Sequence, residues 1–289
     1  MVDTTGLADD EQPQLSMWEA GHYYSPIPDL AEVRRRHVEL FETIPPSLPG
    51  IDLRAEAQLE LVRTLAAYSG EMPFTREGSP ALRYRFDNDF FAEGDAVMLY
   101  GMLRLHRPRR YVEIGSGWSS ALTLDVRDLF FDEPMECLFV EPYPDRLDML
   151  LRPEDHSTVR VLREPLQKVW REVVAALAPG DFLFIDSSHV GKIGSDVLTE
   201  LQDVVPRLPA GVHVHLHDIF YPFEYPPYWV YEGRFWNEAY LLRALITDNP
   251  RLQIECFNSY LAALHHDEVS ALFPVWANNT GGSIWLLTR

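Results

Sequence analysis

Two short runs of polar residues follow apolar segments, and they hold the side chains best suited to chemistry. Residues 186–192 read Asp-Ser-Ser-His-Val-Gly-Lys, and residues 215–219 read His-Leu-His-Asp-Ile. If the preceding segments are parallel strands, both runs leave the sheet at its carboxyl edge, where open α/β sheets bind ligands. His189 could remove a proton at neutral pH, because the ordinary histidine pKa is about 6.5. Lys192 is a weaker candidate for the same role, and Asp186 could instead cap the segment that follows.

A glycine-containing turn is the most informative stretch of the chain. Residues 112–120 read Val-Glu-Ile-Gly-Ser-Gly-Trp-Ser-Ser, which predicts a strand, a tight turn and the start of a helix. Glycine permits the positive φ of such a turn and lets a ligand approach the backbone. The first turn of a helix adds unpaired N–H groups. We therefore expect this turn to cradle a ligand.

The residue spacing leaves several classes of ligand to compare. A nicotinamide cofactor is disfavoured, because Ser120 stands where the third glycine of G-x-G-x-x-G is expected. A phosphate-transfer enzyme is disfavoured, because the Gly-Lys-Ser/Thr of the Walker A motif does not follow the turn. A fold that binds a cofactor without catalysing a reaction stays open.

The turn resembles the first motif of class I S-adenosylmethionine-dependent methyltransferases, through Glu113, Gly115, Ser116 and Gly117. Glu141, at the end of the next predicted strand, is similar to the ribose-binding acid of that family. The pattern of residues 281–286 agrees with the family as well, and the resemblance covers residues 111–289. It implies that the cofactor is S-adenosyl-L-methionine.

The resemblance also implies positions for the cofactor contacts. Glu141 would accept the ribose hydroxyls, and the backbone of the glycine turn would face the methionine part. Three further residues are expected at the cofactor: Trp118, Glu164 and Asp186. Trp118 could equally pack on the N-terminal segment, and Glu164 could equally be a helix-start carboxylate beside Pro165.

The two polar runs resemble the sites of divalent-metal-dependent O-methyltransferases of the catechol and sugar type. By position, Asp186 matches the first metal ligand of that family, and His217 and Asp218 match its acidic pair. His217 departs from the family, which usually has a carboxylate there. Oxygen ligands suit Mg²⁺, whereas a histidine shifts the preference toward Mn, Fe or Zn.

This resemblance implies in-line O-methylation of a small molecule, with the metal ion or His189 assisting deprotonation. The expected catalytic residues are Asp186, His189 and His217. N-methylation of a small amine, with His189 as the base, and C-methylation are the alternatives.

An aromatic segment follows the second polar run. Residues 220–236 hold nine aromatic residues among seventeen, and their three prolines favour a binding loop or lid. The side chains expected to contact the substrate are Tyr221, Tyr225, Trp229, Arg234 and Trp236. The same aromatics could instead join an N-terminal cap to the core, and Arg234 could pair with a neighbouring acid.

The elements that must position these residues follow from the alternation of short apolar runs with amphipathic segments. Strands are expected at residues 111–114, 137–141, 159–162, 182–186, 212–216, 252–262 and 283–287. A long helix is expected at residues 233–247. This order predicts an α/β fold. With the resemblance, we expect a Rossmann-like seven-stranded sheet, mostly parallel with an antiparallel C-terminal edge.

Helical patterns and prolines dominate the chain before the first strand. Helices are expected at residues 30–41, 53–68 and 92–105. We therefore expect a flexible tail at residues 1–14, a helical N-terminal cap at 15–105 and a methyltransferase domain at 106–289.

Composition limits the partners. The 289 residues carry a formal net charge of −19, which disfavours nucleic acid and anionic membranes and favours a small-molecule substrate. No apolar run is long enough to cross a membrane, and the acidic start is not a secretory signal, so we expect a cytoplasmic protein. Cys137 and Cys256 are expected to be reduced, buried thiols. The sequence leaves open whether the chain forms a homo-oligomer.

Overall fold

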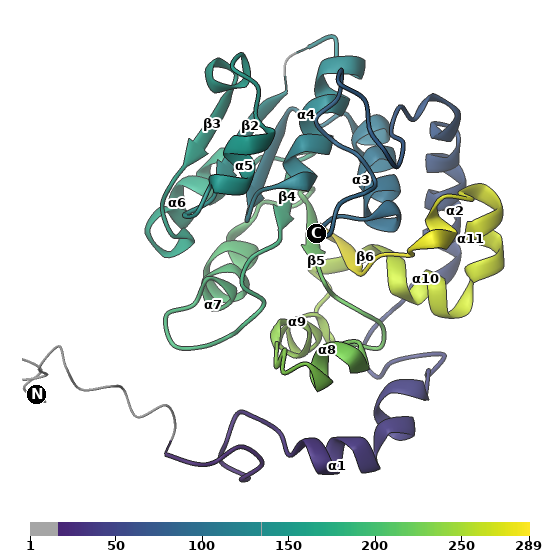
Figure 1. Ribbon diagram of the computed structural model, residues 1–289, viewed down its shortest axis with the longest axis vertical. Coiled ribbons are helices and arrows are strands. Elements are labelled where there is room, and N and C mark those ends of the chain that lie inside the picture. Colours follow the sequence, from purple (N-terminus) through teal and green to yellow (C-terminus); the bar gives the residue numbers. More distant parts are fainter. Residues whose placement is uncertain (1–16, 134) are drawn as a thin grey trace, which may run out of the picture. The chain divides into compact units, whose positions relative to one another are not determined.

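A computed structural model describes residues 17–133 and 135–289, and the predicted tail at residues 1–14 lies outside this range. In the described residues, seven strands form one sheet in the order β3-β2-β1-β4-β5-β7-β6 (Figure 1). The strands are β1 (Arg110–Ile114), β2 (Glu136–Val140), β3 (Val159–Leu162), β4 (Phe182–Ile185), β5 (His213–His217), β6 (Leu252–Phe257) and β7 (Ser283–Thr288).

The sheet confirms the predicted fold class, an α/β Rossmann-like sheet that is mostly parallel. Strands β1 to β5 pair in parallel, and β7 runs antiparallel to both of its neighbours. The C-terminal strands β6 and β7 form the predicted antiparallel pair at one edge of the sheet, with β7 between β5 and β6.

The strand predicted at residues 252–262 is too long. β6 ends at Phe257, and the chain continues as α10 (Asn258–Leu264). Asn258 is buried, and its amide donates a 2.9 Å hydrogen bond to Asp95, which holds the chain at this point. Local apolar character favoured a strand, and this tertiary contact ends it.

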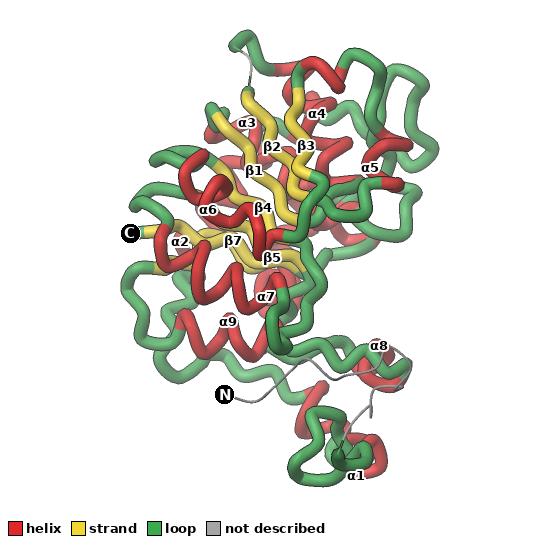
Figure 2. The backbone as a smooth tube through the Cα atoms, turned by 90° about the vertical axis from the view of Figure 1, so that its left-hand side faces the viewer, coloured by secondary structure: helices red, strands yellow, loops and turns green. Residues whose placement is uncertain are grey.

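Helices cover both faces of the sheet. One face carries α4 (Trp118–Phe130), which packs on α3 (Glu93–His106) and on α5 (Asp145–Leu150). The other face carries α6 (Leu166–Ala176), α7 (Asp196–Thr199) and α9 (Glu238–Ile246), which lie in front of the strands in Figure 2. The central strands β4 and β5 are buried along their whole length. The sheet therefore offers its strand ends, and not its faces, to ligands.

Buried hydrogen bonds of Asp95 and buried ion pairs of Arg83 hold the start of α3 and the segment before it. Asp95 accepts hydrogen bonds from Asn258, from the hydroxyl of Ser283 at 2.6 Å and from the backbone of Gly282 at 3.0 Å. The buried guanidinium of Arg83 pairs with Asp155 at 2.6 Å and with Asp125 at 2.8 Å. These contacts attach α3 and residues near 83 to the sheet layer.

The chain forms two compact units. The second unit holds Ile44–Pro226 and Trp236–Arg289, and the first holds, of the described residues, 17–43 together with Pro227–Phe235. The first unit contains α1 (Leu30–Arg35) and α8 (Pro227–Tyr231), and in it Tyr231 contacts His37 at 2.8 Å. Residues 44–105, expected in a separate cap, therefore share a unit with the sheet. The reason is that α2 (Ala55–Ala66) packs on β6, and α3 packs on α4.

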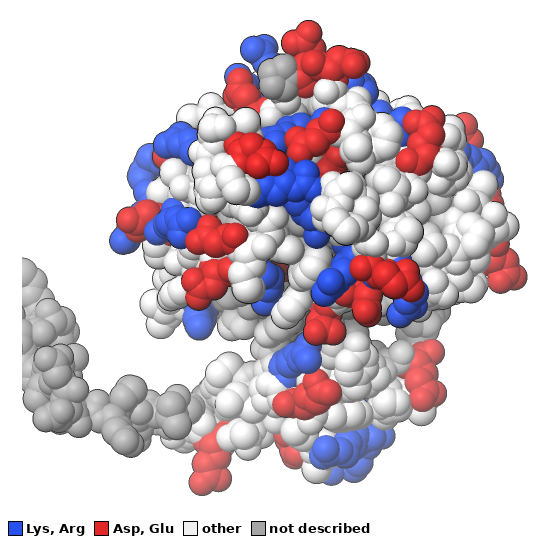
Figure 3. All heavy atoms as spheres, turned by 45° about the horizontal axis from the view of Figure 1, so that its top comes forward, with Lys and Arg blue, Asp and Glu red and all other residues white. Residues whose placement is uncertain are grey.

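Surface and cysteine features were also predicted. Within the described residues, no helix has both the length and the apolar character needed to cross a membrane. Acidic and basic side chains are interspersed over the face shown in Figure 3. Cys137 and Cys256 are both free and buried, as the sequence predicted.

Candidate functional site

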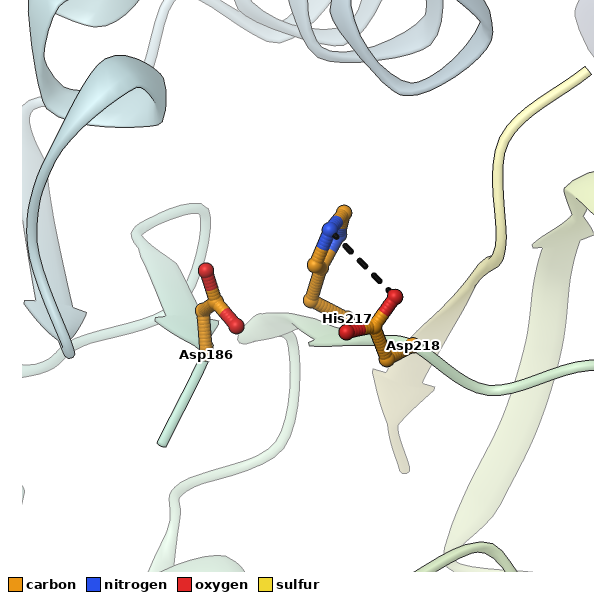
Figure 4. Close-up of side chains that lie close together, drawn as sticks. All are labelled: Asp186, His217 and Asp218. Carbon is orange, nitrogen blue, oxygen red and sulfur yellow. Dashed lines mark ion pairs between the residues drawn. The ribbon is translucent and has the colours of Figure 1, made fainter. Parts of the chain in front are cut away.

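The two polar runs meet at the carboxyl ends of β4 and β5. Ile185 at the end of β4 pairs with Leu216 in β5, so Asp186 comes level with His217. One ligand atom from each of Asp186, His217 and Asp218 lies within 4.8 Å of the others (Figure 4). We call these three residues the acidic cluster.

The charges of the acidic cluster depend on one another. Burial alone would raise the pKa of Asp186, but His217 and His189 lower it below its usual value. Burial raises the pKa of Asp218 to about 6. Burial would lower the pKa of His217, but the carboxylates of Asp218 and Asp186 raise it. Nδ1 of His217 is buried without a hydrogen-bond partner among the described residues. Two carboxylates and an imidazole nitrogen at this spacing suit a divalent cation.

His189 lies beside the acidic cluster and contacts three carboxylates. Its Nδ1 is 2.9 Å from Oε2 of Glu238, and its Nε2 is 3.3 Å from Asp186 and 3.6 Å from Asp218. Burial disfavours a charged ring, but Asp186 and Glu238 raise the pKa of His189 well above 6.5. Both ring nitrogens therefore face carboxylates. The role of His189 as a general base stays a prediction.

A cavity of about 500 Å³ adjoins the acidic cluster at the ends of β1, β2 and β4. Gly115, Glu141, Tyr143, Asp186 and Lys192 are among the residues that line it. Both oxygens of Glu141 accept backbone hydrogen bonds, from Ser116 at 2.9 Å and from Tyr143 at 2.8 Å. These bonds hold the carboxylate at the mouth of the cavity. Lys192 lines the cavity, but it does not belong to the acidic cluster.

A smaller cavity of about 60 Å³ is also lined by the glycine turn. It shares Gly115, Glu141 and Asp186 with the larger one, and its other lining residues include Ser116, Gly117, Trp118 and Arg146. The hydroxyl of Ser116 is buried and has no partner among the described residues. The glycine turn therefore borders two hollows that an elongated ligand could fill.

Glu113, the first residue of the motif that resembles the methyltransferase family, lines neither of the two cavities. Its carboxyl is fully buried and accepts hydrogen bonds from the hydroxyls of Ser119 and Ser120, the latter at 2.7 Å. Ser120 in turn accepts the backbone N–H of Gly117 at 3.0 Å. Burial raises the pKa of Glu113 to about 8, so the group is mostly neutral. It holds the glycine turn from inside the protein.

Trp118 and Glu164, for which the sequence left two interpretations each, have different surroundings in the structure. Trp118 lines the smaller cavity, and the centre of its ring lies 6.3 Å from that of Tyr84, which it meets edge-on, so its contact with the cofactor stays a prediction. Glu164 is exposed and pairs with Lys168 at 2.8 Å. The cavity is lined instead by the next residues, Pro165, Leu166 and Gln167. This favours the helix-start interpretation of Glu164.

The aromatic segment divides between the two compact units. Trp236 joins the site, because its ring lies 4.4 Å from the ring of His189. Tyr221 and Tyr225 are buried, with hydroxyl contacts to the backbone of Pro45 and Ala239.

Trp229 and Arg234 belong to the first unit. There the Arg234 guanidinium lies 4.9 Å from the centre of the Trp229 ring and 3.2 Å from Glu232. Their substrate role stays a prediction.

Sequence reasoning missed Glu238 and Arg146. It placed Glu238 inside a helix at residues 233–247, whereas α9 begins at Glu238 itself. An acidic residue after Asn237 is a typical helix start, and this signal could have corrected the boundary. No comparable signal in the sequence singles out Arg146.

The chain is similar to several known proteins. Residues 112–219 match the family model described as a methyltransferase domain. An uncharacterized protein of Archaeoglobus fulgidus is 38% identical over 127 residues, which are 43% of this chain and 58% of the relative. This chain thus spans less than two thirds of that relative.

Two solved structures are similar over most of both chains. An SAH-bound methyltransferase of Podospora anserina has a TM-score of 0.45 at 14% identity, over 90% of this chain and 96% of the other. An O-methyltransferase from Bacillus cereus in complex with SAH has a TM-score of 0.44 at 13% identity, over 89% and 97%.

Proposed function

Because residues 112–219 match the family model of a methyltransferase domain, we propose that the protein transfers the methyl group of S-adenosylmethionine to a hydroxyl of a small molecule. One observation carries the proposal. Asp186 lines both hollows around the glycine turn and also belongs to the acidic cluster. A cofactor in the hollows would therefore end beside groups that can prepare an acceptor.

The two hollows suggest how the cofactor would lie. Glu141 would accept the ribose hydroxyls, since a carboxylate fixed by two backbone N–H groups keeps further acceptor positions. The smaller hollow would hold the amino-acid end, beside the backbone of Gly117 and the guanidinium of Arg146. The first N–H groups of α4 point into the same region and favour a carboxylate.

The acidic cluster would hold a divalent ion through Asp186, His217 and Asp218. Such an ion, when bound, lowers the pKa of a coordinated hydroxyl and orients it toward the methyl group. The single nitrogen ligand favours Mn, Fe or Zn over Mg. The nitrogen ligand would be Nε2 of His217, which lies 3.7 Å from Asp218. The ion would supply a route to deprotonation that does not depend on His189 as the base.

The first test is calorimetric titration of the full chain with S-adenosylhomocysteine and, separately, with NAD. We expect micromolar binding of the former, no binding of the latter, and a loss of about tenfold or more in Glu141→Ala. Glu164→Ala is the matched control, because this exposed carboxylate does not line the cavity. A folded protein that binds no S-adenosylhomocysteine would contradict the proposal.

The second test concerns the acceptor. A screen of hydroxylated and amine acceptors with S-adenosylmethionine should give methylation that EDTA abolishes and a divalent ion restores. Asp186→Asn should abolish the methylation, and added divalent ion should not restore it. Methylation of amines that is indifferent to EDTA would instead establish the N-methyltransferase alternative.

A further inference from the structure

The loop after β4 is held by the residues that begin α9. The backbone N–H groups of Asn237 and Glu238 both donate to the carbonyl of His189, at 3.1 and 3.2 Å. The side chain of Asn237 accepts the N–H of Gly191 at 2.6 Å. A Cβ on Gly191 would lie 2.4 Å from Leu241, so this glycine permits α9 to dock. The backbone of the loop is therefore fixed before its side chains are considered.

The ring of His189 is fixed as well. Its backbone has a φ of 58°, which non-glycine residues rarely adopt. Glu238, only 1% exposed, accepts its Nδ1 proton at 2.9 Å, and the ring of Trp236 lies against it at 4.4 Å. With Nδ1 held in this way, Nε2 faces Asp186 and Asp218. A buried acid on α9 thus determines what His189 presents to the acidic cluster.

We propose that Glu238 is a positioning residue of the site, which orients His189 so that its Nε2 faces Asp186 and Asp218 and fixes their spacing. The proposal rests on the proposed function, because those two carboxylates are assigned there to a divalent ion. Carboxylates that bind metals are commonly oriented by a further hydrogen bond, and loss of that bond typically weakens metal affinity by about 10-fold to 100-fold. Glu238 would act on these carboxylates indirectly, by orienting the imidazole ring of His189.

The chain offers a matched control for the substitution. His213 on β5 and Glu255 on β6 form the same kind of pair, Nδ1 to carboxylate at 2.7 Å, and neither residue belongs to the acidic cluster. Titration with Mn²⁺ should show about tenfold weaker binding in Glu238→Ala and less than a twofold change in Glu255→Ala. Glu238→Gln keeps an oxygen that accepts the Nδ1 proton, so we expect it to stay within twofold of the wild type. An unchanged affinity in Glu238→Ala overturns the proposal.

A double-mutant cycle tests whether Glu238 acts through the imidazole. In a His189→Ala background, Glu238→Ala should cause no further loss of Mn²⁺ affinity, since the group it orients is gone. A second loss of the same size would show that Glu238 acts by another route and would overturn the proposal.

A measurement without metal separates this inference from the proposed function. The side-chain carboxyl ¹³C resonances of Asp186 and Asp218 in metal-free protein should move in Glu238→Ala and stay in place in Glu255→Ala. S-adenosylhomocysteine affinity should be unchanged in both variants, which also shows that they are folded. If the wild type binds no Mn²⁺, the ion assignment in the proposed function fails, and these resonances alone decide the role of Glu238. Resonances that do not move overturn it.

Discussion

The carbonyl oxygen of Asp186 occupies the space that a side chain on Gly115 would need. A Cβ on Gly115 would lie 1.7 Å from that oxygen, and Gly115 has a φ of 77°. The backbone N–H of Asp186 donates to the carbonyl of Ile114 at 2.8 Å. The glycine turn and the start of the acidic cluster are therefore in direct backbone contact, and the distance between the two sites is set by the absence of a side chain.

Gly115→Ala should disrupt both the turn and the position of Asp186. We expect S-adenosylhomocysteine affinity to fall at least tenfold and the free energy of unfolding to fall by about 2 kcal/mol or more. Gly180→Ala is the control, because Gly180 also has a positive φ, 87°, but a Cβ there would meet nothing within 4 Å. The free energy of unfolding of Gly180→Ala should fall by only about 1 kcal/mol, and its affinity for S-adenosylhomocysteine should be unchanged. Calorimetric titration and urea unfolding measure both effects, and equal binding losses in the two variants would refute this account.

Arg146→Met should weaken binding of the charged end of the cofactor only. The guanidinium lies 3.5 Å from the centre of the Phe90 ring and lines the smaller hollow, and it has no hydrogen bond or ion pair within residues 17–133 and 135–289. Titrations should show about tenfold weaker binding of S-adenosylhomocysteine. The affinity for 5′-methylthioadenosine, which lacks the amino-acid carboxylate, should be unchanged. Arg171→Met is the control, since Arg171 also lies over an aromatic ring, that of Trp170, at 4.4 Å. Equal weakening of both ligands would place the carboxylate elsewhere.

Glu113 should make stability depend on pH. Its pKa is about 8 in the folded protein against an ordinary 4.5. Between these values the folded state keeps a proton that the unfolded state releases, so stability falls as pH rises through this window. The loss between pH 4.5 and 8 is on the order of 3 kcal/mol.

Glu113→Gln keeps the shape of the side chain but cannot ionise. Urea unfolding of the two proteins at pH 5 and pH 8 should therefore show a smaller pH-dependent loss of stability in the variant. Parallel pH profiles of the two proteins would show that Glu113 is ionised when folded.

Arg83→Met should destabilise the protein without touching the site. Removal of the guanidinium leaves the buried carboxylates of Asp125 and Asp155 without their partner, which typically costs about 3–5 kcal/mol. Arg163→Met, which breaks an exposed pair with Asp148, should cost less than about 1 kcal/mol. Urea unfolding distinguishes the two, and similar losses would mean that the buried pair contributes no more than a surface one.

Local patterns predicted most of the strands, because apolar runs and glycine turns are short-range features. They also placed the two polar runs at one edge of the sheet, since parallel strands end there, whereas the choice of Asp186, His217 and Asp218 came from the family resemblance. The same reasoning could not find Glu238, which is 49 residues from His189 and meets it only because α9 docks on the loop after β4. Nor could it choose between the two roles of Glu164, because that choice depends on where the helix start lies relative to the cavity.

The position of β7 has a consequence for the growing chain. Residues 283–288 follow the other strands in the sequence, yet they pair with β5, the strand that carries His217. During synthesis, one edge of β5 stays unpaired until these residues emerge. Until then Asp95 also lacks its hydrogen bonds to Gly282 and Ser283. An open edge of this kind invites pairing with other chains. Until β7 has emerged, the nascent protein therefore exposes an open edge at β5, and β6, whose pairing partner in the described sheet is β7, cannot join the sheet.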